Sequence, residues 1–282
     1  MLLPDPQLQT AIDRFPQRVK TWSLVVTMFG DAIQPAGGAI PLADITRALA
    51  PAGIAPGAVR TAMSRLASDG LVITERTGRS SIYRLTPAGA AEFLPAESRI
   101  YGPMTAQGRD VVLALCPPGL TAAQREALAR KVRHGGGAML SGVAIWQADA
   151  PPAPDWLDAH DLWPLTASPA PAPDWLATHL ADPDMRETWD ALEAWIQHLP
   201  LQPRDANSAM ALRVLMIDGW RRAALRHPRL PEGWFPADWP AARLRAKVAE
   251  RYTRYVAASA GFLTPEREAA AAAVLKTRFR MC

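Results

Sequence analysis

The sequence predicts a mainly helical α+β chain built from three parts, and three observations predict this class. Short amphipathic helices precede two β-rich runs near the N-terminus, a strand–helix–strand pattern occupies the middle, and helices with proline-rich turns fill the remainder. Hydrophobic residues make up 49% of the 282 residues, which is enough to bury real cores. A chain of this length favours two or three units over a single one.

The first part, residues 18–97, begins with two short predicted helices. Residues 19–33 place apolar side chains at helical spacing, and a proline with two glycines then breaks the helix. Residues 41–53 predict a second helix that begins at a proline and buries three aliphatic side chains. Both helices need a partner for their apolar faces.

A third helix is predicted in "APGAVRTAMSRLASDG", residues 55–70. Pro56 suits the first turn of a helix, and Gly70 suits the left-handed residue that ends one. One face of this helix is apolar. The opposite face gathers the residues that we predict to contact DNA, which are Arg60, Thr61, Ser64, Arg65 and Ser68.

Residues 71–86, "LVITERTGRSSIYRLT", predict a β-hairpin with its turn at 77–80. Three helices followed by a hairpin form the plan of a winged helix-turn-helix, in which the third helix enters the major groove. Arginine can donate two hydrogen bonds to the edge of a guanine, while serine and threonine can bond to base edges or phosphates. From residue 56 to 86 five arginines stand against two acids. The hairpin residues that we predict to contact DNA are Arg76, Arg79, Ser80 and Arg84.

Charge and cysteine content set further limits. The formal net charge of +4 permits a nucleic-acid partner without requiring one, so the location of the charge matters more than its sum.

Cys116 and Cys282 lie far apart, which argues against a disulfide framework or a zinc site and fits a reducing compartment. The chain shows neither a signal-peptide pattern nor a run of ~20 apolar residues. We therefore expect a cytoplasmic protein with no membrane partner.

The middle part, residues 98–170, predicts a β-α-β unit. Residues 110–116, "DVVLALC", predict a buried strand, Thr121 caps a helix, and residues 137–146 predict a second strand. A unit of this size suits a small ferredoxin-like domain.

Nothing in the sequence makes a case for an enzyme, a metal or a cofactor. "HGGG" at 134–137 is similar to the oxyanion loop of some esterases, but that loop requires a G-x-S-x-G elbow and the chain has none. A turn that ends a helix explains these glycines better. The five histidines show no ligand spacing.

Two segments carry a resemblance to a known family. "SLVVTMFGDAIQPAGGAIPLADITRALAPAGIAPGAVRTAMSRLASDGLVITERTGRSSIYRLTPAG" closely resembles the N-terminal region of the phenylacetate-degradation repressor (PaaX-type) family of winged-helix transcriptional regulators. "LRVLMIDGWRRAALRHPRLPEGWFPADWP" resembles that family's C-terminal signature. The resemblance implies a repressor of aromatic-acid catabolic genes, a central domain that helps to pair two subunits, and phenylacetyl-CoA or a related acyl-CoA as the effector.

The last part, residues 171–282, predicts a helical domain for which two interpretations stay open. Nine of the ten tryptophans lie at or after Trp146, and large aromatics of this kind fill helical cores. Alternatively, a tryptophan stacks on an aromatic acyl group while arginines hold the phosphates of a coenzyme A thioester. The candidates for that effector site are Arg213, Trp220, Arg221 and Arg222.

The sequence therefore favours a DNA-binding transcriptional regulator, a homodimer on a two-fold double-stranded operator, that an aryl-CoA thioester releases. The competing hypothesis is a helical ligand- or protein-binding module whose winged domain mediates protein contacts. Steep weakening of binding with salt distinguishes the first from the second.

Overall fold

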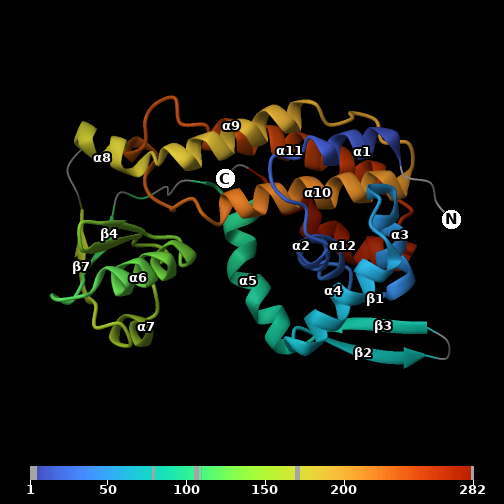
Figure 1. Cartoon of the computed structure of the whole chain (residues 1–282), viewed down its shortest axis with the longest axis horizontal. Helices are drawn as coiled ribbons and strands as arrows, with labels where there is room; N and C mark the ends of the chain where they lie inside the picture. The colour runs from blue at the N-terminus through green and yellow to red at the C-terminus, as the bar shows by residue number, and fades with distance from the viewer. Residues whose placement is uncertain (1–4, 78–79, 105–107, 109, 169–171, 281–282) are drawn as a thin grey trace. The chain divides into compact units, whose positions relative to one another are not determined.

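The computed structural model describes residues 5–77, 80–104, 108, 110–168 and 172–280, and its helices and strands are labelled in Figure 1. Contacts divide the chain into two compact units. The first unit comprises residues 1–102, 190–221 and 243–282, and the second comprises residues 103–189 and 222–242. Helices and two small antiparallel sheets make up the described part, so the predicted α+β class is confirmed. The division at 18–97, 98–170 and 171–282 stays a prediction.

The first unit begins with helices and a small sheet, and longer helices from the C-terminal half complete it. Its N-terminal elements are α1 (Pro6–Asp13), α2 (Thr21–Met28), a π-helix (Phe29–Ile33), β1 (Ala39–Pro41), α3 (Leu42–Leu49), α4 (Pro56–Ser68), β2 (Val72–Thr77), β3 (Ser80–Leu85) and α5 (Pro87–Tyr101). The later elements are most of α9 (Pro183–Gln197), α10 (Ala206–Ala224), α11 (Ala241–Ala258) and α12 (Pro265–Thr277).

The third predicted helix is confirmed with its boundaries as α4. Pro56 occupies the first turn, where its missing N–H costs no hydrogen bond. After the helix, Gly70 takes a left-handed φ of 72°, and the Leu71 N–H donates to the Leu66 carbonyl at 3.0 Å. The apolar face of α4, with Val59 at its centre, is buried, which leaves the polar face outward.

A π-helical turn modifies the first predicted helix. The α-helical pattern stops at Met28, and the Gln34 N–H donates to the Phe29 carbonyl at 2.8 Å, a bond that spans five residues. Asp31 lies inside this wider turn and is buried. The prediction of one regular helix over 19–33 is wrong in this detail.

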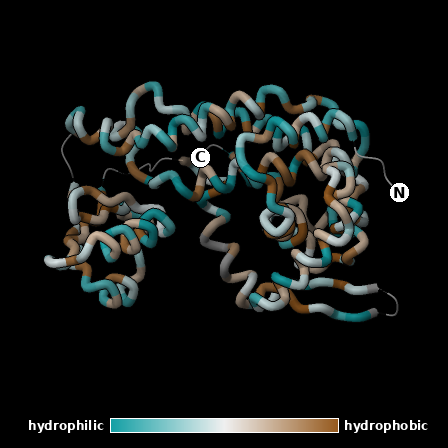
Figure 2. Tube along the Cα trace, in the orientation of Figure 1, coloured by the Kyte–Doolittle hydropathy of each residue, from teal (hydrophilic) through white to brown (hydrophobic). Residues whose placement is uncertain are grey.

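The predicted hairpin forms two strands of a three-stranded antiparallel sheet in the order β1-β3-β2. Thr77 pairs with Ser80, so the turn has two residues, and both lie outside the described part. Strand β2 is apolar at its start and hydrophilic toward its end (Figure 2). Strand β1 was not predicted, because its three residues lie among the glycines and prolines that end the first helix.

The second unit contains a four-stranded antiparallel sheet in the order β5-β6-β4-β7. Its elements along the chain are β4 (Val111–Leu115), α6 (Ala122–His134), β5 (Ala138–Leu140), β6 (Val143–Gln147), α7 (Pro154–Asp158), β7 (Trp163–Ala167) and α8 (Asp174–Leu180). The predicted strand at 110–116 and the helix capped by Thr121 are confirmed, the latter with a complete capping box to Gln124. The core between sheet and helix includes Trp146 and Val132.

The prediction of one strand at 137–146 is wrong, because β5 and β6 form a hairpin there. Ser141 and Gly142 take positive φ angles of 47° and 89°, which reverse the chain in two residues. The preceding glycines end α6, as predicted. Gly137 also lets the chain approach β6, because a Cβ there would lie 2.6 Å from Nε1 of Trp146.

No helix in the described ranges combines the length and the hydropathy that a membrane span needs.

Candidate nucleic-acid interface and ligand cavity

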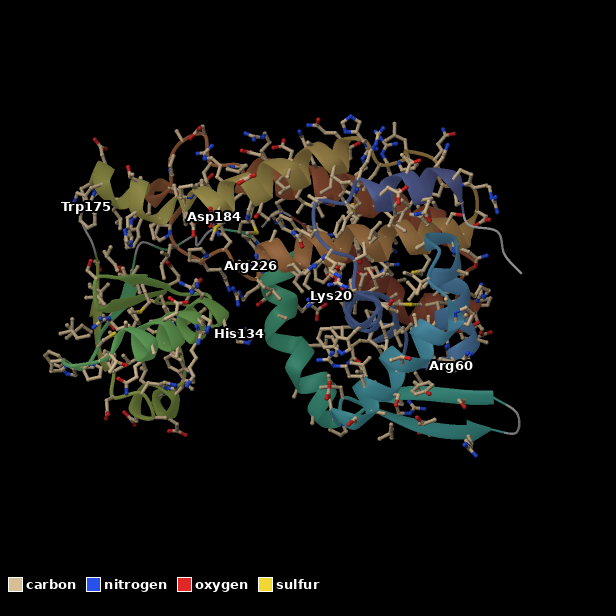
Figure 3. All side chains as sticks on the ribbon, in the orientation of Figure 1. Lys20, Arg60, His134, Trp175, Asp184 and Arg226 are labelled. Atoms are coloured by element: carbon tan, nitrogen blue, oxygen red, sulfur yellow. The ribbon has the colours of Figure 1, made fainter. Side chains whose placement is uncertain are left out.

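The five residues predicted on the third helix share one exposed face of α4. Arg60, Thr61, Ser64, Arg65 and Ser68 are all exposed, and Figure 3 labels Arg60 on this helix. The buried positions of the helix alternate with them at helical spacing. This face therefore leaves side chains of the right kind for a major groove in contact with solvent. Their contact with DNA stays a prediction.

The two arginines of this face differ in how they are held. The Arg65 guanidinium lies 5.2 Å from the ring centroid of Trp22 on α2, and its Nε lies 3.8 Å from Oδ2 of Asp69. Arg60 makes no ion pair within the described ranges. Arg65 is thus oriented by its own fold, whereas Arg60 is available to a ligand.

The hairpin adds exposed arginines beside α4. Arg76 and Arg84 are exposed, and the Arg84 Nε lies 3.2 Å from Oε1 of Glu75 on the neighbouring strand. The predicted contacts Arg79 and the side chain of Ser80 lie outside the described residues.

The four candidates for an effector site do not converge on one surface. Trp220 is fully buried and donates from Nε1 to the carbonyl of Ile100 at 2.7 Å. Arg221 donates to Ser23 and Thr27 of α2 and pairs with Asp218. Arg222 is half-buried and belongs to the second unit by contact.

Arg213, the remaining candidate, is 3% exposed and lines the cavity described below. Effector binding by the four candidates stays a prediction. Arg213 lines that cavity but binds Asp31, and Trp220 and Arg221 are engaged within the first unit.

Most tryptophans fill cores, as one of the two open interpretations expects. Trp189 is fully buried beside the His227 ring, and the Trp239 Nε1 donates to Nε2 of His227 at 2.9 Å. Two tryptophans of the second unit break this pattern, since Trp163 and Trp175 are 63% and 59% exposed.

A buried charge cluster centred on Asp31 joins the N-terminal helices to the C-terminal ones. Oδ2 of Asp31 accepts from the Arg213 Nε at 2.6 Å, and Oδ1 lies 3.1 Å from Nη1 of Arg278. The hydroxyls of Tyr101 and Tyr252 donate to the same Oδ1 at 2.7 and 2.9 Å. Every oxygen of this carboxylate is therefore satisfied away from water.

Electrostatics keep Asp31 ionised in this apolar setting. Burial alone opposes the charged form, but Arg213 and Arg278 outweigh it, and the pKa of Asp31 is lowered from its ordinary value. Burial raises the pKa of Tyr252 to about 12, so its hydroxyl keeps the proton that it donates.

Sequence reasoning did not find this cluster as a site. Asp31 is an acid in an otherwise apolar helix, and that contrast was the available signal. Its partners are 70 to 247 residues away along the chain, so no local spacing reveals them.

The end of the chain enters the same cluster. After α12, Arg278 donates to the carbonyls of Gly30 and Asp31 as well as to the Asp31 carboxylate. Phe279 takes a left-handed φ of 59° and is buried, with its ring centroid 5.2 Å from that of Tyr101. These two residues anchor the C-terminal end of α12.

A cavity of about 740 Å³ lies between α11 and α12 in the first unit. Its walls are mainly small apolar side chains, among them Ala32, Met210, Val256, Leu263, Ala272 and Leu275. Arg213 and Arg278 border it from the Asp31 side, and Lys276 and Arg280 also line it. The volume falls within the range of small-molecule sites.

Comparison with known proteins defines the class of this chain. Two family models match it, one described as PaaX-like protein over residues 20–89 and one as PaaX-like protein C-terminal domain over residues 183–265. Together they span more than half of the chain. The transcriptional repressor PaaX of Escherichia coli (strain K12) is 27% identical over 284 residues, covering 94% of this chain and 89% of that protein.

The chain belongs to the PaaX-like family. Its named relative is a transcriptional repressor. The solved structure of the uncharacterized protein Rv0674 from Mycobacterium tuberculosis shares the fold, with a TM-score of 0.53 and 23% identity, covering 81% of this chain and 90% of that one.

Proposed function

We propose that this chain is a transcriptional repressor that binds double-stranded DNA through α4 and the β2–β3 hairpin. The observation that carries the proposal is the exposed arginine-bearing face of α4, followed at once by a hairpin with further exposed arginines. Its family relative in E. coli is a transcriptional repressor, which supports the same function here.

The element order supports a winged helix-turn-helix as the DNA-binding device. Helices α2, α3 and α4 precede the hairpin, and β1 pairs with β3 to complete the small sheet. In this plan α4 is the recognition helix and the hairpin is the wing. The arginines of α4 then read bases in the major groove, while those of the wing neutralise phosphates.

We further propose a homodimer that pairs through the second unit. The order β-α-β-β-α-β with all strands antiparallel is that of the ferredoxin-like motif. Leu115 of β4 pairs with Trp163 of β7, and Leu165 lies two residues further on the same face. All three are exposed, so this face offers apolar area to a second copy. A dimer of this kind matches a two-fold operator.

We propose the effector and the target genes from the resemblance of this chain to its family. The proposed targets are genes of aromatic-acid catabolism of the phenylacetate type, and the proposed effector is phenylacetyl-CoA or a related aryl-CoA thioester. An effector releases a repressor only if it binds better to the arrangement that does not fit the operator. The thioester should therefore weaken DNA binding, and operator DNA should weaken thioester binding by the same factor.

Selection of bound duplexes from a random DNA pool tests the DNA-binding proposal. We expect the full chain to enrich a two-fold sequence, and we expect its affinity to fall steeply between ~50 and ~200 mM salt. Repeating the selection with phenylacetyl-CoA should reduce recovery. If no sequence is enriched and no duplex binds at low salt, the winged unit contacts protein instead of DNA.

A further inference from the structure

We infer that the cavity between α11 and α12 is a site for a small amphiphilic anion, and that its occupant acts on α4 through Asp31 and Arg47. The inference rests on the proposed function in taking α4 as the DNA-contacting helix. The location of the site and its route to α4 come from the contacts of the first unit alone.

The cavity has the chemistry of a site for an apolar group that carries an anion. Aliphatic side chains form most of its wall, and their burial of an aromatic or acyl group is favourable. Lys276 and Arg280 are exposed lining residues, and neither forms an ion pair with a described residue. Two of the acids in the lining are already engaged, since Glu250 pairs with Arg254 and Glu268 accepts from the Gly261 N–H.

Helix α12, which forms one wall of the cavity, buries few side chains. It packs mainly through alanines, and Ala271 is its one fully buried residue within the described part of the chain. The anchors at its C-terminal end are Arg278 and Phe279, which belong to the Asp31 cluster. An occupant that shifts α12 therefore also moves the groups that hold Asp31.

The first route from the cavity to α4 runs through the π-helix. Ala32 lines the cavity and follows Asp31 directly in the chain. Arg213 and Arg278 both line the cavity and both bind the Asp31 carboxylate. The π-helix continues α2, and α2 packs against α4. A displacement of Asp31 can therefore be transmitted through α2 to α4.

A second route runs through α3, the helix before α4. Arg47 of α3 donates to the carbonyl of Phe262 at 3.0 Å, and its guanidinium lies 4.3 Å from the centroid of that ring. Phe262 precedes Leu263, which lines the cavity. The same arginine donates to Asn207 of α10. Arg47 thus connects α3 to the residue next to the cavity wall, and α3 packs against α4.

Binding to the full chain without DNA tests the location of the site. The probes are phenylacetyl-CoA and 8-anilinonaphthalene-1-sulfonate, an aromatic sulfonate that reports by fluorescence. Ala272→Phe fills the cavity, and we expect it to weaken both probes at least tenfold. Ala273→Phe, on the exposed side of the same helix, should change binding less than twofold. Both variants are first checked for an unchanged thermal unfolding midpoint.

Hydrogen exchange tests the route to α4 independently of any operator. We expect a saturating probe to change amide exchange at least twofold in residues 29–34 and 56–68, and Arg47→Ala to reduce the change in the second segment. Equal probe binding by Ala272→Phe and Ala273→Phe overturns the location of the site, and unchanged exchange in both segments overturns the route. If Ala272→Phe weakens binding of the sulfonate while phenylacetyl-CoA does not bind to the wild type, the inferred site is supported and the proposed thioester effector is wrong.

Discussion

Asp31 lies at the centre of the buried charge cluster of the first unit. It is fully buried and balances two buried arginines, Arg213 and Arg278. Asp31→Asn keeps the shape but leaves Arg213 without its counter-charge and Arg278 with Glu97 alone, so we expect a loss of about 3–5 kcal/mol in the free energy of unfolding. Urea unfolding measures it.

Asp69→Asn is the matched control, because its ion pair with Arg65 is exposed and long at 3.8 Å. Such a pair contributes about 0–1 kcal/mol. If the two asparagine variants lose similar stability, the cluster around Asp31 does not hold the unit together.

Single residues were predictable from the sequence where a local rule fixes them. Pro56 and Gly70 frame α4 because proline and glycine have strong positional preferences at helix ends. The exposed set around Arg60 followed from helical spacing alone. The partners of Asp31 were not predictable, because tertiary contacts between distant segments create them.

At the scale of elements, Glu193 fastens α9 to α11. Its carboxylate accepts from the Arg243 Nη2 at 2.8 Å and also pairs with Lys247. The hydrogen bonds from Arg243 lead the causes that lower the pKa of Glu193 from 4.5 to about 2, against the opposing effect of burial. Since the folded pKa is depressed, this stabilisation is present above pH 4.5 and is lost as the pH falls toward 2.

Glu193→Gln should therefore cost about 1–2 kcal/mol at pH 7, a value discounted because Arg243 is half exposed to solvent. The difference from the wild type should narrow as the pH falls from 4.5 toward 2. Urea unfolding over a pH series measures this. Glu250→Gln, in an exposed pair with Arg254, serves as the control and should stay within about 0.5 kcal/mol throughout. If the difference in unfolding free energy between Glu193→Gln and the wild type is the same at every pH, the ionised Glu193 does not stabilise the fold.

The wing makes a separate prediction about salt. If Arg76 and Arg84 neutralise phosphates, replacing either by alanine should weaken all DNA sequences about equally and lower the salt slope by roughly 1 per contact. Arg130→Ala, on the exposed face of α6, is the control and should leave the slope unchanged. Loss confined to one sequence means that the wing reads bases instead.

Helices and strands were predictable where the hydrophobic periodicity extends over many residues. The prediction failed for elements of only a few residues. The spacing in 55–70 and the sequence after the Thr121 cap both predict long helices, and both helices are present. Strands of three residues such as β1 and β5 carry too few positions to show alternation. The Ser141–Gly142 dipeptide was the available turn signal inside the predicted strand.

On the scale of the whole molecule, chain order and spatial grouping differ. The hydroxyl groups of Ser23 and Thr27 on α2 donate hydrogen bonds to Asp218 of α10 and accept hydrogen bonds from Arg221 of the same helix. Sequence distance gave no hint that residues near 20 and near 220 share one unit. A boundary placed from composition alone cannot detect such a return of the chain.

The proposed dimer predicts a change in mass for one surface substitution. Trp163→Lys puts a charge into the exposed apolar face of β4 and β7, and desolvating that charge disfavours pairing. We expect the variant to sediment as a monomer in analytical ultracentrifugation, while the wild type sediments as a dimer. Trp175→Lys, at a similarly exposed tryptophan on α8, is the control. A Trp163→Lys dimer as tight as the wild type places the interface elsewhere.

The affinity of the full chain for a selected duplex, with and without Arg60, tests the central claim most directly. Arg60 is exposed on α4 and makes no ion pair within the described residues, so its removal should leave the unfolding midpoint unchanged. Arg60→Ala should weaken specific binding by about 1–3 kcal/mol, whereas Arg130→Ala on α6 should bind like the wild type. Wild-type affinity in both Arg60→Ala and Arg65→Ala would contradict the account, because the exposed face of α4 would then not contact DNA.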